Sequence, residues 1–254
     1  MSYEACAALV ERGDPERFLA IMAAPFAARK VLFPIIAFNL EVARAPWVTE
    51  EPMIAEMRLQ WWRDALEEIA DGKPARRHEV VTPLAEVITP TQARRLDRLV
   101  AMRRWDIYKE PFEDADHFDA YLDATAAELM VVSAQALGDA SAEVVRSYGW
   151  GVGLANWLRA VPELQARGRV PMVDDRSEAV RLLAQRGLAL IREARARRAA
   201  VSAKARPAML MGWKADAVLS KAAKNPNAVS SGALEPSPAR VKLALMVKAG
   251  MGRW

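Results

Sequence analysis

The sequence predicts an all-α protein. Apolar residues recur every three to four positions through most of the chain, and no stretch shows the sustained two-residue alternation of a half-buried strand. Proline and glycine interrupt this pattern at several points, as expected between helices. The 254 residues, 52% of them hydrophobic, are enough to bury one large core. We therefore expect a single domain over residues 1–254, with its core at about 14–203 and a basic helical extension at about 204–254.

The first two predicted helices have clear local signals. Asp14 can accept hydrogen bonds from free backbone donors, and the proline that follows loses nothing at the first helical position, so a helix is expected over about 14–23. A second helix is expected over about 26–44. There Pro34 removes one hydrogen bond and should bend the axis.

The third predicted helix starts at Glu51-Pro52 and ends before the turn at 71–74. Its bulky apolar residues fall on or near one stripe, which we expect to face the core. They are Met53, Met57, Trp61 and Leu66.

Further helices are expected over about 80–88, 91–108, 116–137 and 142–161. The last of these contains Gly149, Gly151 and Gly153. Because glycine weakens a helix, these residues predict the close approach of a neighbouring backbone or of a ligand.

After a loop at 165–176, the chain turns basic. The remaining predicted elements are a helix over about 177–203, a break at Pro207, a helix over about 213–223, a turn-rich linker at 225–232 and a last helix over about 238–249.

Charge is distributed unevenly along the chain. Residues 176–254 hold 16 Lys and Arg against four Asp and Glu, a net of +12, whereas residues 1–175 carry 20 against 28, a net of −8. A basic segment of this kind suits an anionic lipid surface, a nucleic acid or the acidic region of the same protein. No nucleic-acid-binding module is present, and the arginines at 192–198 have no interleaved aromatic residues, so we expect no nucleic acid partner.

Several classes of site are excluded by residue usage. The single cysteine, Cys6, forms no disulfide within the chain, and His78 and His117 have no metal-ligand partner at helical spacing. Neither a nucleophile elbow nor a phosphate-binding glycine loop is present. No run of 18 apolar residues and no signal-peptide pattern occurs, which predicts a cytoplasmic protein without a metal site.

Three segments together resemble the squalene/phytoene synthase family: Ala37–Arg44 (AFNLEVAR), Arg58–Leu66 (RLQWWRDAL) and Gly153–Pro162 (GLANWLRAVP). The resemblance covers about residues 18–254. It implies an isoprenoid-synthase-like helical bundle around a central cavity, where two aspartate pairs on facing helices hold magnesium ions and a diphosphate.

The places of these aspartates are occupied by residues without a carboxylate: Ala43, Trp47, Ala160 and Leu164. Glu41 and Glu163 are the nearby acids. One carboxylate on each helix is a poor substitute for two pairs that grip several metal ions. The resemblance therefore implies no catalytic residue and no cofactor.

The same segments are similar to a family branch that contains a mitochondrial complex I assembly factor. This implies a pseudoenzyme that acts as an assembly or scaffold factor, with respiratory complex subunits as partners. The net charge of +12 in residues 176–254 adds the expectation that the basic C-terminal region docks on the anionic inner face of the cytoplasmic membrane. Two alternatives stay open. One is an active transferase of prenyl diphosphates that uses magnesium with Glu41 and Glu163, and the other is a protein that binds an isoprenoid or another lipid in the cavity.

The ligand-binding candidates are Asn39, Glu41, Arg58, Trp61, Arg159 and Arg169. Trp61 and Arg58 suit an aromatic and cationic lining, although adjacent helical residues point about 100° apart and Trp62 cannot face the same way. Arg159 and Arg169 suit an anion site inherited from a diphosphate-binding ancestor. The alternative for these two arginines is a structural bridge between helices.

Overall fold

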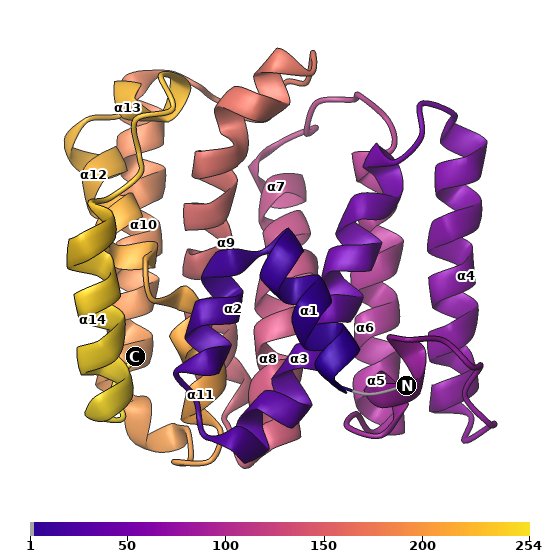
Figure 1. Ribbon diagram of the computed structural model, residues 1–254. Helices are drawn as coiled ribbons and strands as arrows, with labels where there is room; N and C mark the ends of the chain where they lie inside the picture. The colour runs from indigo at the N-terminus through magenta and orange to yellow at the C-terminus, as the bar shows by residue number, and fades with distance from the viewer. Residues whose placement is uncertain (1–2) are drawn as a thin grey trace.

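The computed structural model describes residues 3–254 and confirms the all-α class, since this part of the chain forms helices and no β-strand (Figure 1). The α-helices are α1 (Tyr3–Gly13), α2 (Pro15–Met22), α3 (Phe26–Arg44), α4 (Pro52–Ala70), α5 (Val81–Ala85), α6 (Pro90–Met102), α7 (Ala115–Leu122), α8 (Glu128–Leu137), α9 (Ala142–Ala166), α10 (Ser177–Ala196), α11 (Arg206–Met209), α12 (Ala215–Lys224), α13 (Asn227–Ser230) and α14 (Pro238–Gly250). Short 3₁₀ segments are η1 (Ala45–Trp47), η2 (Arg103–Asp106), η4 (Arg198–Ala200) and η5 (Leu210–Gly212), and η3 (Asp123–Ala127) is a π-helical turn.

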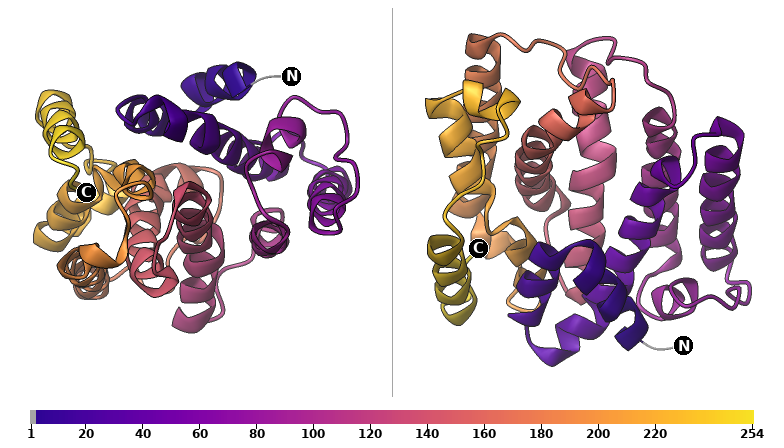
Figure 2. Two further views of the ribbon diagram at one scale, coloured as in Figure 1. Left: turned by 90° about the horizontal axis from the view of Figure 1, so that it is seen from below. Right: turned by 45° about the horizontal axis from the view of Figure 1, so that its top comes forward.

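The long helices stand side by side around the middle of the molecule. α9 packs against α10 on one side and against the continuous α7–η3–α8 helix on the other, while α4 packs on α6 and α6 on α8. α1 and α2 pack on α3, which also contacts α8. Seen from below, α1, α2 and α3 lie across one side of this arrangement, and α14 stands at its outer edge (Figure 2).

Local signals explain several of the helix boundaries. The Asp14 carboxylate accepts a hydrogen bond from the Arg17 backbone N–H at 2.8 Å and caps α2, which begins at a proline as predicted. Thr89 and Gln92 form a capping box at the start of α6. α3 contains Pro34 inside the helix, as predicted.

The predicted buried stripe of α4 is wrong at two positions. Met53 and Met57 are 74% and 67% exposed. The buried face is instead formed by Ala55, Leu59, Trp62, Ala65, Leu66, Ile69 and Ala70. Alternative stripes on one helix differ by a rotation of about 100° per residue, and only the neighbouring helices decide which stripe is covered.

Other differences from the sequence-based prediction are two unpredicted helices, one shifted helix end and one π-turn. α1 was not predicted, and α9 continues through Pro162 to Ala166, where a loop from residue 165 was expected. The predicted linker contains the short helix α13. The expected 116–137 helix is continuous but contains the π-turn η3, for which the sequence carries no recognisable signal.

The glycines of α9 allow close helix packing, which confirms the predicted approach of a neighbouring backbone. A Cβ atom on Gly149 would lie 2.8 Å from the Ala127 Cα, and one on Gly153 would lie 2.4 Å from the Ala126 Cβ. Both contacts are with η3, so α9 and η3 together make a tight wall. Within residues 3–254, no helix has both the length and the apolar character needed to cross a bilayer.

Candidate functional site

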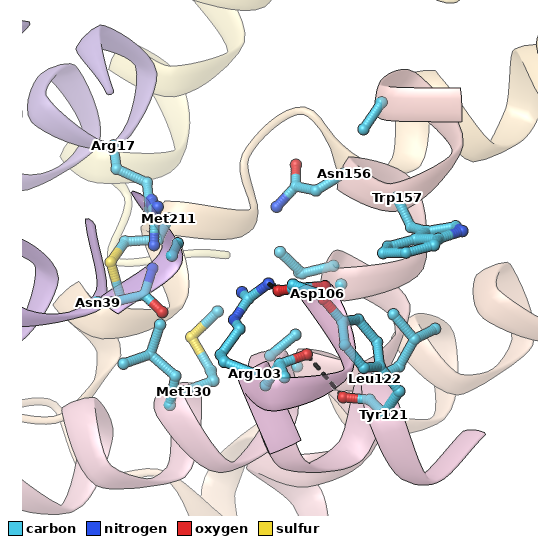
Figure 3. Close-up of a pocket in the computed structure, with 18 of the residues that line it drawn as sticks. Arg17, Asn39, Arg103, Asp106, Tyr121, Leu122, Met130, Asn156, Trp157 and Met211 are labelled. Carbon is cyan, nitrogen blue, oxygen red and sulfur yellow. Dashed lines mark hydrogen bonds and ion pairs between the residues drawn. The ribbon is translucent and has the colours of Figure 1, made fainter. Parts of the chain in front are cut away.

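A cavity of about 290 Å³ lies between α2, α3, η2, the α7–η3–α8 helix and α9. Figure 3 shows its polar side chains, which come from opposite walls and from segments far apart in sequence. The lining residues include Arg17, Asn39, Arg103, Asp106, Tyr121, Thr125, Met130, Asn156, Trp157 and Met211. Asn156 is exposed and marks the open side.

Arg103, Asp106 and Tyr121 form a closed hydrogen-bonded triangle in this cavity. The Tyr121 hydroxyl donates to Asp106 Oδ1 at 2.7 Å, and Arg103 Nη1 donates to Asp106 Oδ2 at 2.9 Å and to the Tyr121 oxygen at 2.7 Å. Burial, together with the Asp106 charge, raises the pKa of Tyr121 well above its ordinary value. Burial opposes the charged form of Arg103, but Tyr121 and Asp106 outweigh it and hold its pKa above the ordinary value. The triangle is thus an internally neutralised unit of a cation, a carboxylate and a phenol.

A second polar pair lies on the opposite wall. The Asn39 side-chain oxygen, in the amide orientation that satisfies both groups, accepts from Arg17 Nη1 at 3.0 Å and from Nη2 at 3.2 Å. Arg17 also pairs with Asp14. Asn39, one of the predicted ligand-binding candidates, therefore lines the cavity and helps to hold an arginine there.

Apolar side chains occupy the part of the cavity where the family resemblance places the metal-binding aspartates. Ala43, Trp47, Ala160 and Leu164 all line the cavity. Asp106 is the single Asp or Glu in the lining, and both of its oxygens accept hydrogen bonds from Arg103 or Tyr121. This donor set does not fit a magnesium cluster, which needs several free carboxylate oxygens. No group of three or more potential metal ligands occurs elsewhere among residues 3–254.

Three of the other predicted site residues lie outside this cavity. Glu41, Arg58 and Trp61 line a separate hollow of about 180 Å³ with Trp62 and His78. Glu41 forms an ion pair with Arg44 at 3.1 Å. Trp61 is half-buried, and its ring stacks obliquely on His78.

Glu163, the second acid predicted for the transferase alternative, is largely exposed on α9. Its carboxylate pairs with Arg167 at 2.6 Å, one turn further along the same helix. It is absent from the cavity lining. Glu41 and Glu163 are therefore not brought together at one site by the fold.

Arg159 and Arg169 both have protein partners. Arg159 donates to the two carboxylate oxygens of Glu16 at 2.8 and 2.9 Å and to Glu235 at 2.6 Å. Arg169 is buried and donates to the backbone carbonyl of Tyr108 at 2.9 Å and to that of Asp106. Both arginines bridge elements of the bundle.

Sequence reasoning missed the two arginines and the tyrosine of the cavity. Arg103 and Asp106 are spaced three residues apart, which is the one local sign of an ion pair. Tyr121 joins them from a different helix. Arg17 is far from all three family-like segments, and only the packing of α2 on α3 places it beside Asn39.

Comparison with known proteins gives consistent results. The sequence model of the squalene/phytoene synthase family matches residues 10–176. A Drosophila melanogaster protein named NADH dehydrogenase (ubiquinone) complex I, assembly factor 6 homolog is 29% identical over 177 residues, which cover 66% of this chain and 53% of that protein. The human protein named NADH dehydrogenase (ubiquinone) complex I, assembly factor 6 is 25% identical over 169 residues, covering 65% and 51%. The chain thus spans about half the length of these relatives.

A solved structure supports the fold independently. The crystal structure of a dehydrosqualene synthase in complex with a ligand superposes with a TM-score of 0.81 and covers 98% of this chain and 95% of that chain. The sequence identity is 15%, so this likeness describes the fold alone.

Proposed function

The chain belongs to the squalene/phytoene synthase family, and from this premise we propose that it is a non-catalytic member that acts as an assembly or scaffold factor for a respiratory NADH dehydrogenase. Transfer of a prenyl group requires the departure of diphosphate, and the family's reaction depends on metal ions that neutralise that charge. The proposal is that this chain keeps the fold and has given up the metal-dependent chemistry.

The observation that carries the proposal is the composition of the cavity wall. Ala43, Trp47, Ala160 and Leu164 face the cavity, and its one carboxylate is already neutralised by Arg103 and Tyr121. The arginines that remain, Arg17 and Arg103, attract an anion less strongly than their number suggests, because each is paired with an aspartate. Without free carboxylates to hold magnesium, no metal ion stabilises the charge of a leaving diphosphate.

The names of the relatives supply the direction of the proposal. Both the insect and the human protein are called complex I assembly factors. The matched region covers about two thirds of this chain and makes up about half of each relative. We propose subunits of a respiratory complex as the partners on this basis.

The role can be tested by deleting the gene in the cells that make this protein. We expect less assembled NADH dehydrogenase on native gels and a lower rate of NADH oxidation by membranes, with other respiratory enzymes unchanged. A wild-type copy should restore both. Normal levels of assembled enzyme in the deletion strain would contradict the proposal.

Catalysis can be tested separately with purified protein. Farnesyl and geranylgeranyl diphosphate with magnesium should release no pyrophosphate above the background rate. Turnover that is lost in the variants Glu41→Gln and Glu163→Gln would instead support the transferase alternative. Because these two glutamates lie away from the cavity, we expect neither variant to change any measured rate.

Binding of an isoprenoid or another lipid is a second candidate, which the cavity itself favours. Its wall combines apolar residues with the paired arginines, as an amphipathic ligand requires. Mass spectrometry of an organic extract of the purified protein tests it. A stoichiometric lipid that disappears in the cavity-filling variant Ala160→Phe would support this candidate, and an empty extract would count against it.

A further inference from the structure

A second hollow, of about 350 Å³, lies where the last turns of α10 and α14 meet. It is separate from the main cavity, and we call it the C-terminal pocket. Its lining residues are Arg195, Arg198, Asp216, Val247, Lys248, Met251, Arg253 and Trp254. Four cationic side chains therefore face one carboxylate.

The carboxylate of this pocket, Asp216, already pairs with two of the four cations. Arg195 donates to Asp216 Oδ1 at 2.7 Å and to Oδ2 at 2.6 Å. Lys248 Nζ lies 3.5 Å from the same Oδ2, as an ion pair without a hydrogen bond. Arg198 and Arg253 make no ion pair within the described part of the chain. The side chains of the pocket thus carry more positive than negative charge.

Buried donors in the same place also lack acceptors. Trp254 is 5% exposed, and its Nε1–H has no hydrogen-bond partner. Lys248 Nζ and Arg195 Nε are likewise buried and without a hydrogen bond. Since buried donors in folded proteins are nearly always hydrogen-bonded, three donors without a hydrogen bond in the residues that line one hollow suit an acceptor-rich group. Burial and the Arg195 charge lower the pKa of Lys248, which an anion in the pocket would reverse.

An exposed apolar stripe continues outward from this pocket along α14. Its residues follow the helical spacing i, i+3, i+4 and i+8, so they share one face. They are Leu243, Met246, Val247 and Met251. Val247 and Met251 also line the pocket, which makes the two features continuous. The opposite face of α14 is buried through Val241 and Leu245.

We propose that the C-terminal pocket and the α14 stripe together dock the protein on an anionic phospholipid surface. The pocket receives a headgroup phosphate, and the stripe enters the boundary between headgroups and acyl chains. A basic helix with an outward apolar face is the ordinary form of such contacts. This proposal goes beyond the assembly role and does not depend on it.

Charge favours a lipid surface over other occupants. Residues 236–254 contain four Lys or Arg and no Asp or Glu, so the charged side chains of this segment attract an anionic surface. In a two-fold dimer formed through this pocket, Arg198 and Arg253 of one copy would lie close to the same arginines of the other copy. Like charges at that distance repel each other. α14 also stands at the outer edge of the molecule, where a flat surface can reach it (Figure 2).

The test is co-sedimentation of the full chain with vesicles. We expect binding to vesicles of phosphatidylcholine and phosphatidylglycerol in equal parts, weakening at high salt, and little binding to phosphatidylcholine alone. The variant Arg198→Gln/Arg253→Gln should bind about 25-fold more weakly, because each cation near an anionic surface contributes about fivefold. The variant Met246→Ser/Met251→Ser should bind roughly tenfold more weakly.

Matched controls remove the same charge, or the same number of methionines, elsewhere on the surface. Arg77→Gln/Lys109→Gln removes the same charge from other exposed positions, and Met53→Ser/Met57→Ser removes two methionines that are as exposed as Met246 and Met251. Both controls should bind like the wild type. All four altered pairs are at the surface, and circular dichroism should confirm that each variant is folded.

Four outcomes would overturn the proposal. Equal binding to neutral vesicles, or wild-type binding by the α14 and pocket variants, would remove the lipid site. Complete displacement by inorganic phosphate at the lipid phosphate concentration would make the pocket a site for a free ion. A dimer in light scattering that dissociates in Met246→Ser/Met251→Ser would make the stripe a contact between copies.

Discussion

The central cavity and the C-terminal pocket both contain cationic side chains, but they differ in how far nearby protein groups neutralise them. In the cavity, Arg103 donates hydrogen bonds to a carboxylate and to a phenol within 3 Å, and the phenol also donates to the carboxylate. In the C-terminal pocket, Arg195 and Lys248 share Asp216, Arg198 and Arg253 have no paired carboxylate among the described residues, and buried donors remain without acceptors. An arginine in a hollow is therefore no sign of an anion site by itself. What distinguishes the two hollows is whether the protein supplies the counter-charge.

The largest effect should come from breaking the neutralised triangle. In Asp106→Ala, Arg103 would keep its charge in a buried place without its carboxylate, and we expect a loss of about 3–5 kcal/mol in the free energy of unfolding. Urea denaturation followed by circular dichroism measures it. The control Asp97→Ala removes the partner of Arg63, a pair about one-third exposed, and should cost about 1 kcal/mol or less. Equal losses of unfolding free energy in the two variants would show that Asp106 contributes no more to stability than the partly exposed Asp97.

An added methyl group should destabilise the tightly packed cavity wall but not the end of α14. Gly153→Ala places a Cβ 2.4 Å from the Ala126 Cβ in the cavity wall, so we expect a loss of about 1–3 kcal/mol. Gly250→Ala at the end of α14 meets nothing within 4 Å and should be neutral or stabilising by up to about 1 kcal/mol. Thermal unfolding of both variants gives the comparison. A stable Gly153→Ala protein would mean that α9 and η3 can separate without cost.

Removing a cation from the C-terminal pocket should raise the free energy of unfolding, whereas breaking the triangle should lower it. Lys248→Met deletes a charge that burial and Arg195 disfavour, while Asp216 keeps its pairing with Arg195. We expect the free energy of unfolding to rise by roughly 1 kcal/mol. A loss of stability on urea denaturation would show that Lys248 is a structural cation.

The pH dependence of that gain provides a finer test. The folded-state pKa of Lys248 lies below the ordinary value of 10.5, so the unfavourable charge is fully present below the folded pKa. It disappears as the pH rises through the folded pKa towards the unfolded one. The stability difference between Lys248→Met and the wild type should therefore be largest near neutral pH and shrink on going to alkaline pH. A difference that grows with pH would contradict the assigned shift.

Much of the fold was predictable because its signals are local. Asp14 with its following proline, the helix start at Pro52 and the break at Pro207 act over a few residues, and helices begin near them. The exposed Met53 and Met57 show the limit of this approach. Their spacing is helical, but the face that α6 and η1 cover is a different one.

The candidate site was less predictable because its members meet only in three dimensions. Asn39 lines the cavity, whereas Glu41, two residues further on, lies at another hollow. Arg159 was a candidate for anion binding, and its partner Glu16 is 143 residues away in the chain. No spacing rule within a helix connects such residues.

By itself, the sequence determined the helical class, the family and the strongly basic last third, because these depend on composition, periodicity and short motifs. The tertiary structure decided where that positive charge is cancelled. Arg186, Arg197 and Lys214 reach the acidic first part of the chain at Asp119, Glu143 and Glu16. Arg198 and Arg253 reach no carboxylate among the described residues. The physical reason is that a charge is neutralised only by a partner a few ångströms away, and folding alone decides which residues come that close.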